Sequence, residues 1–159
     1  MIVPGKLVRW LGGSLDVLRA HWRGCETIDG IDVCGTQEFR RAVTAALLLL
    51  RDNELPMWDA LARHVGSIME GRRSFVIVTA HPAFMFIDRP HWSQAAEFLA
   101  ATMAFEACSV LLHRTHEAEH PRRRVPRDIY RGEAAVERCE NAYRECLLAL
   151  GKDVPPRGG

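Results

Sequence analysis

The most constraining feature of this sequence is a long stretch without glycine or proline that runs from Ser93 to His120. Apolar residues fill most of it, and Pro121 follows directly. Because glycine and proline are the residues that usually interrupt helices, the stretch predicts one long helix that ends before Pro121. In a chain of 159 residues, a helix of this length is expected to form the central strut of the core.

Three further segments carry the apolar spacing of helices, and a short fourth one near the start of the chain is compatible with it. They cover Thr36 to Leu50, Pro56 to Gly71, Gly132 to Leu150 and, for the short one, Ser14 to Trp22. In the second segment Trp58, Leu61, Val65 and Ile68 form the apolar stripe, and Gly71 is a natural stop.

A small amount of β structure is predicted as well. Asp29-Gly30 is a strong signal for a two-residue type I′ hairpin turn, which sets Cys25 opposite Cys34 in a non-hydrogen-bonded pair. A disulfide between them is sterically allowed, but in a reducing cytosol two packed thiols are favoured. Ser74 to Thr79 and Phe84 to Ile87 are rich in β-branched or aromatic residues and predict one or two more strands.

These elements predict a mainly α-helical chain with a minor β component, an α+β fold, in a single domain over residues 1–159 with a frayed tail from about 152 to 159. A formal charge of +1 gives no global reason to expect nucleic acid or an anionic membrane as partner. No apolar run approaches the length of a membrane span, and the first residues lack a secretory pattern. We therefore expect a soluble, cytoplasmic protein.

Glu106 is the only charged residue between Phe98 and Leu112. We expect its carboxylate to be at least partly buried, and burial is costly unless the group is hydrogen-bonded, paired or bound to a cation. Glu106 is therefore a candidate catalytic residue. The alternative is that it lies on an outward stripe of the helix or pairs with an arginine.

A second candidate site is the literal HExxH motif His116-Glu117-Ala-Glu-His120. Two histidines four residues apart on a helix can both bind zinc, while Glu117 can accept a proton from zinc-bound water. Against this, His120 directly precedes Pro121 and three arginines, so one ligand would lie on a fraying, exposed turn. His113 falls on the same side, which leaves an adventitious surface cluster as a further interpretation.

The C-terminal part carries three motifs in one register: Val125-Pro126-x-Asp128-x-x-x-Gly132, then Ala135-x-x-x-Cys139, then Leu147-x-x-Leu150-Gly151. In these motifs and in its order of elements, most of the chain resembles small bacterial zincin-like domains. The resemblance implies a zincin-like single domain built on the long central helix, with a final helix that supplies a third ligand.

In this register the metal-binding motif of the family falls on Phe105 to Ser109, and its third ligand falls on Val136. The resemblance then implies that all three zinc ligands are lost, while Glu106 keeps the catalytic position. It also implies that Phe105, Ser109 and Val136 lie close together, with apolar groups filling the volume of the metal and its water.

The sequence therefore favours a binding or regulatory protein with a zincin-like fold that has lost its catalytic zinc, needs no cofactor and binds a protein or peptide partner. Whether the chain is an enzyme is left open, with the non-catalytic interpretation preferred. The first alternative is an active zinc metallopeptidase with Glu117 as catalytic residue and His116 and His120 as metal ligands. The second is a structural helical subunit for interaction with other chains. Homo-oligomer formation stays open in each case.

Overall fold

The fold was analysed in a computed structural model that describes residues 4–154, and the side chains of residues 14–154. The helices are α1 (Pro4–Arg23), α2 (Gln37–Asp52), α3 (Pro56–His64), α4 (Arg89–Trp92), α5 (Ala96–Glu119), α6 (Asp128–Arg131) and α7 (Glu133–Ala149). The strands are β1 (Cys25–Ile28), β2 (Ile31–Cys34), β3 (Val65–Glu70), β4 (Phe75–Ile77) and β5 (Ala83–Ile87). The predicted mainly α fold with a minor β component is confirmed.

The strands form one mixed sheet in the order β1-β2-β3-β5-β4. The predicted hairpin is confirmed, because β1 pairs antiparallel with β2 and Cys25 lies opposite Cys34. The chain then leaves the sheet through α2 and α3 and returns as β3, parallel to β2. β5 runs parallel to β3, and the short β4 closes the far edge antiparallel to β5.

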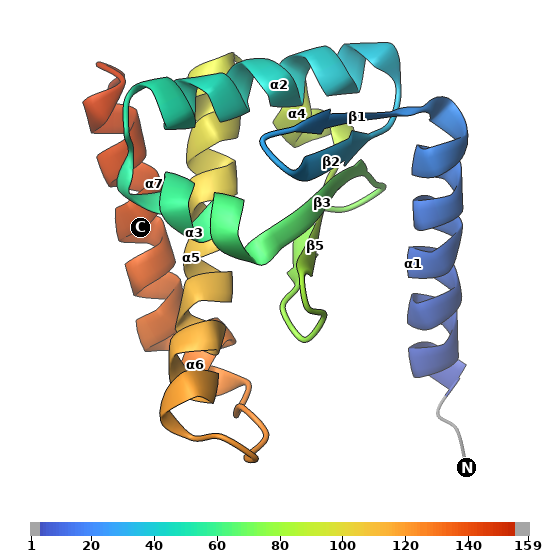
Figure 1. Ribbon diagram of the computed structural model, residues 1–159, viewed down its shortest axis with the longest axis vertical. Helices are drawn as coiled ribbons and strands as arrows, with labels where there is room; N and C mark the ends of the chain where they lie inside the picture. Colours follow the sequence, from blue (N-terminus) through green and yellow to red (C-terminus); the bar gives the residue numbers. More distant parts are fainter. Residues whose placement is uncertain (1–3, 155–159) are drawn as a thin grey trace.

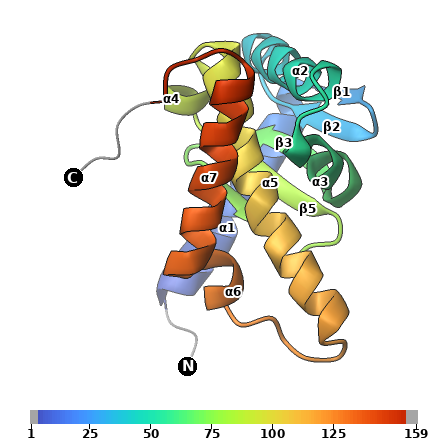
Figure 2. The ribbon, with the colours of Figure 1, turned by 90° about the vertical axis from the view of Figure 1, so that its left-hand side faces the viewer.

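Helices cover both faces of this sheet unequally (Figures 1 and 2). On one face α2, α3, α5 and α7 form the main core with alternate strand residues such as Val33, Ile68 and Met85. On the other face α1 packs alone, and the intervening residues Cys34 and Met69 point to it. The period-two alternation of a strand thus divides the apolar side chains between a large and a small core.

The predicted long helix is present as α5, which starts three residues later than expected. The segment before it contains α4, a single turn whose N-cap Asp88 accepts a hydrogen bond from the His91 backbone N–H at 3.3 Å. By length and composition α5 would suffice to cross a membrane, but most of its apolar window is buried inside the protein. This burial is typical of the core helix of a soluble protein.

One predicted element is wrong. The helical pattern from Pro56 does not reach Gly71, because α3 ends at His64 and Val65–Glu70 forms strand β3. β3 lies between β2 and β5 in the middle of the sheet, and Ile68 is completely buried there. A central strand that is covered on both faces needs no strict alternation of polar and apolar residues, so its sequence also fits a helix.

The first helix is longer than predicted, and part of the predicted frayed tail makes contacts with the rest of the protein. α1 begins at Pro4, ten residues before the short helix expected at Ser14. Of the predicted frayed tail, residues 155–159 lie outside the described part of the chain. Lys152 lies 3.2 Å from Glu97 in an ion pair, and Val154 packs against the main core.

Candidate functional site

Glu106 lies on the buried side of α5 and is only 8% exposed, which confirms the burial expected from the sequence. Its Oε2 atom is buried and has no hydrogen-bond partner among the residues that the structure describes. Burial raises the pKa of the Glu106 carboxyl, and the positive charges of Arg131 and His91 only partly offset this effect. An outward-facing position is therefore excluded, and the carboxyl is held in an environment that favours its protonated form.

The short helix α6 packs against α5 and brings the positive charge of Arg131 near Glu106. One turn after Glu106, the Ser109 hydroxyl donates a hydrogen bond to the Tyr130 carbonyl at 2.9 Å. Arg131, the next residue, donates to the Val76 carbonyl on β4 at 3.1 Å. These bonds fix a guanidinium near the buried carboxylate, and they occupy Ser109 in a structural contact.

The register implied by the zincin resemblance places Phe105 beside Val136. Phe105 is half-buried and packs against a cluster of Cys108, Cys139 and Ala142 between α5 and α7. Val136 is 38% exposed and is not part of that cluster. A valine that is partly open to water does not fill a buried metal volume, so this part of the resemblance gains no support.

The HExxH motif lies at the C-terminal end of α5. The rings of His116 and His120 stack with their centroids 4.3 Å apart. Glu117 accepts a hydrogen bond from His81 Nε2 at 2.8 Å and lies 3.9 Å from Arg114 Nη1. The bond from His81 holds the pKa of Glu117 below its usual range. The carboxylate that would activate a water is thus engaged with His81 and lies close to the cationic Arg114.

A third ligand is not supplied to this motif within the described residues. The close group of histidine, cysteine or acidic side chains found there does not include His116, Glu117 or His120. The alternative interpretation of an adventitious surface cluster does not hold for His113, because it is 4% exposed and its ring meets Tyr130 edge to face. Burial lowers the pKa of His113, which is consistent with a neutral core histidine.

Cys25 and Cys34 form a disulfide, which corrects the preference for two free thiols. The hairpin register holds their Cα atoms 4.1 Å apart, so the two sulfur atoms meet on the same face of the sheet. A hairpin register that holds the two cysteines this close favours the disulfide over two packed thiols.

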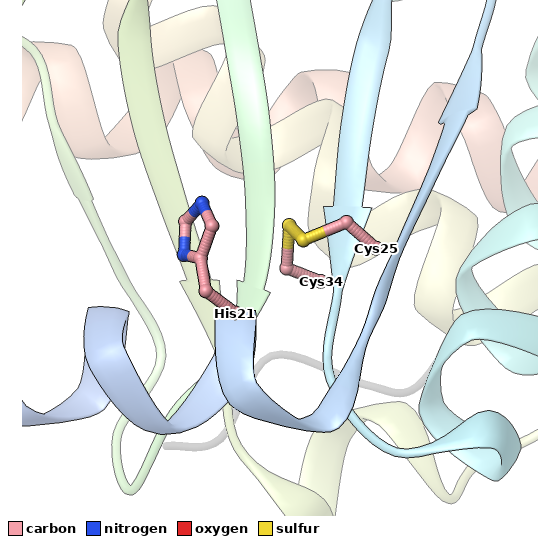
Figure 3. A group of neighbouring side chains, drawn as sticks. All are labelled: His21, Cys25 and Cys34. Carbon is pink, nitrogen blue, oxygen red and sulfur yellow. A yellow bond between two sulfur atoms is a disulfide. The ribbon is translucent and has the colours of Figure 1, made fainter.

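His21, in the last turn of α1, completes a group that the sequence analysis missed. Figure 3 shows its ring beside the disulfide, and the ligand atoms of His21, Cys25 and Cys34 all lie within 4.8 Å of one another. The Cys25 and Cys34 pairing is visible in the sequence, but His21 joins it only through the turn at Gly24. No local pattern signals that contact.

The outer face of α1 is a second feature that the sequence analysis did not identify. Leu15, Leu18 and Trp22 recur at helical spacing and are 49%, 67% and 92% exposed. The opposite side of the helix is anchored, since Ala20 is buried against the sheet and Asp16 pairs with Arg72 at 3.1 Å. Exposure of three large apolar residues in one line is unusual for a surface without a partner.

A shallow apolar depression of about 10 Å³, hardly more than the space of one water molecule, lies between α3, α5 and α7. Its lining is Leu55, Pro56, Met57, Ala104, Ala142, Glu145 and Cys146. The volume is below the range of about 300–1,000 Å³ that is usual for small-molecule sites. None of the candidate catalytic or metal-binding residues lines it.

Comparisons of the chain with protein-family models, with curated proteins and with solved structures found no match. The zincin-like resemblance therefore stays a hypothesis that rests on the residues quoted for it.

Proposed function

We propose that this chain is a non-catalytic, partner-binding protein, in which a zincin-like arrangement of helices has lost its metal ligands. The single observation that carries the binding function is the exposed apolar line on α1, where Trp22 keeps 92% of its surface in water. Large aromatic residues of this kind are enriched at the energetic centres of protein interfaces. A cytoplasmic location belongs to the same proposal.

The spacing of the exposed residues indicates a helix as the occupant. Leu15, Leu18 and Trp22 follow the 3-4 spacing of a coiled-coil seam, and Val8 and Leu11 continue that spacing in the sequence. A seam of this kind is complementary to a second amphipathic helix, which places its own apolar residues between those of α1.

The charges beside the seam select among helical partners. In the described part of α1, Arg19 and Arg23 are exposed, with Arg23 in an ion pair with Glu70 at 3.3 Å, whereas the acidic Asp16 is buried and paired with Arg72. Two copies of α1 would bring basic groups together, which disfavours self-pairing. We therefore assign the seam to a partner helix with an apolar face and acidic flanks.

Two synthetic helical peptides with the same leucine seam, one with glutamate and one with lysine flanks, test this assignment by fluorescence anisotropy. We expect the glutamate peptide to bind at least roughly tenfold more tightly, with a preference that weakens as salt is added. Leu18→Ala is expected to weaken binding by roughly tenfold or more. Leu148→Ala is the matched control, because Leu148 is 64% exposed on α7.

Equal binding of the two peptides, or an equal loss in Leu148→Ala, would show that the α1 face is not a selective docking surface. Analytical ultracentrifugation of the chain alone tests the remaining possibility, which is that α1 pairs with a second copy of itself. A dimer that Leu18→Ala dissociates would identify a second copy as the occupant and would overturn the acidic-helix assignment.

An active zinc peptidase remains the second candidate. The observation in its favour is that His116 and His120 lie on one face of α5 with their rings in contact. The engagement of Glu117 with His81 and Arg114 counts against it. Peptide hydrolysis with and without added zinc decides between the two.

A further inference from the structure

The junction between α1 and the hairpin brings a histidine and two cysteines together. His21 lies at the end of α1, Cys25 begins β1 and Cys34 ends β2. Their possible ligand atoms all lie within 4.8 Å of one another, and the three side chains converge on one side of the sheet (Figure 3). The group therefore comes from one helix and both strands of the hairpin, which are fixed relative to each other.

Backbone hydrogen bonds fix that geometry. Gly24 links α1 to β1, donates to the His21 carbonyl at 3.1 Å and accepts from the Gly35 backbone N–H at 3.0 Å. Its φ of +112° is a conformation that suits glycine, and a Cβ atom there would come within 2.8 Å of Arg40 Nη1. The turn therefore depends on glycine at this position.

The imidazole of His21 is oriented in the way metal-binding histidines usually are. Its Nδ1 lies 2.9 Å from the Val17 carbonyl oxygen, an atom that can only accept a hydrogen bond. Nδ1 must then carry the proton, so in the neutral ring the lone pair is on Nε2. Histidine ligands commonly use this second hydrogen bond to a backbone carbonyl to fix the tautomer and the ring direction.

The two sulfur positions differ in their access to water. Cys34 is completely buried in the small core with Ala20, Met69 and Phe86. Cys25 is exposed, as is His21. One side of the group is therefore dry, which strengthens metal–thiolate bonds, and the other is open to exogenous thiols and to a fourth ligand.

We propose that the dithiol form of this group binds one zinc ion through Cys25 Sγ, Cys34 Sγ and His21 Nε2, and that formation of the Cys25–Cys34 disulfide releases the ion. Binding displaces two thiol protons. Release requires a two-electron oxidant, for which a low-molecular-weight disulfide suffices: the two thiolates lose two electrons to form the S–S bond, and the oxidant is reduced to two thiolates as Zn²⁺ leaves.

The ligand set favours zinc over harder cations. Thiolate sulfur and imidazole nitrogen are the usual zinc ligands, whereas calcium and magnesium require oxygen. Two thiolates also neutralise the charge of the ion, so Arg40, which donates to the backbone at Arg23 and Gly35, does not oppose its binding. Three protein ligands leave a fourth position for water or an exogenous thiolate.

The test uses untagged, full-length protein in its two redox states. Zinc affinity is measured by competition with a chromophoric chelator after reduction with a phosphine and removal of metal, and again after oxidation with a low-molecular-weight disulfide. We expect one zinc per reduced chain and none at this group in the oxidised chain. Cobalt in place of zinc is expected to give the intense visible bands of a tetrahedral site and a thiolate charge-transfer band.

Variants locate the ligands. Cys25→Ser removes an exposed residue, and we expect it to weaken zinc binding by roughly 100-fold or more, with His21→Gln weakening it by roughly 10- to 100-fold. The double variant His116→Gln/His120→Gln is the control, and it is expected to bind as wild type does. The proposal is overturned if the reduced wild-type chain binds no zinc, if the oxidised chain binds it equally well, or if only the control variant loses it.

Discussion

Glu106 provides the sharpest test of how the central helix is used. A carboxyl group that is 8% exposed and has one unpartnered oxygen carries a desolvation cost of about 1–3 kcal/mol. Glu106→Leu removes this cost and keeps a side chain of similar volume on α5. We therefore expect the variant to be more stable than wild type by about 1–3 kcal/mol, which corresponds to a rise of about 0.5–1.5 M in the urea midpoint.

The pH dependence of stability gives a second readout at the same residue. Burial raises the pKa of Glu106 in the folded chain above its ordinary value of 4.5, which applies to the unfolded chain. At a pH between the unfolded-state pKa and the folded-state pKa, the folded chain therefore binds more protons than the unfolded chain. Stability then falls as pH rises through this window, by about 1.4 kcal/mol for each unit of pKa difference. Relative to Glu106→Gln, which does not titrate, wild type should lose stability from about pH 4.5 upward.

Urea unfolding followed by circular dichroism measures both effects. Glu140→Leu is the control, because Glu140 is exposed on α7 and its replacement should change stability by no more than about 0.5 kcal/mol. If Glu106→Leu is instead less stable than wild type by more than about 1 kcal/mol, attraction to Arg131 and His91 outweighs desolvation. A stability difference from Glu106→Gln that does not change with pH would also refute the reasoning.

Two further predictions concern the hairpin and the HExxH motif. The Cys25–Cys34 disulfide closes a loop with a sequence separation of 9. Its reduction should lower the free energy of unfolding by about 2.6 kcal/mol, measured by urea titration with a chelator present. An unchanged free energy of unfolding would show that the hairpin is equally ordered without the disulfide. Peptide hydrolysis by the wild-type chain should not exceed the protein-free rate with added zinc, and zinc-stimulated turnover that only Glu117→Gln abolishes would establish the motif as an active site.

The elements that could be predicted from the sequence are those with local signals. Asp29-Gly30 determines the turn of the hairpin through its own backbone preferences, and the register of Cys25 with Cys34 follows by counting outward. The burial of Glu106 could also be predicted, because a single charge in a long apolar helix has few ways to reach water. Its chemical role stays a prediction.

The elements that could not be predicted depend on partners distant in the chain. Val65 and Ile68 occur at a spacing that suits a helix, and only the pairing of β3 with β2 and β5 makes that segment a strand. The helical position of His113 left a surface cluster with His116 and His120 open, yet Tyr130 of α6 packs against its ring. In both cases the structure is decided by contacts between segments that sequence periodicity does not report.

The contrast between the two histidine-containing sites shows what a motif does and does not establish. Spacing guarantees that His116 and His120 share a helical face, but metal binding needs nitrogen lone pairs that converge on one point with a third ligand. The stacked rings and the engagement of Glu117 by His81 do not provide that convergence. At His21 no motif exists, yet the Val17 carbonyl orients the ring and the hairpin supplies two sulfur atoms within reach. For this chain, the orientation of the histidine and cysteine side chains is therefore stronger evidence for a metal site than the presence of an HExxH motif.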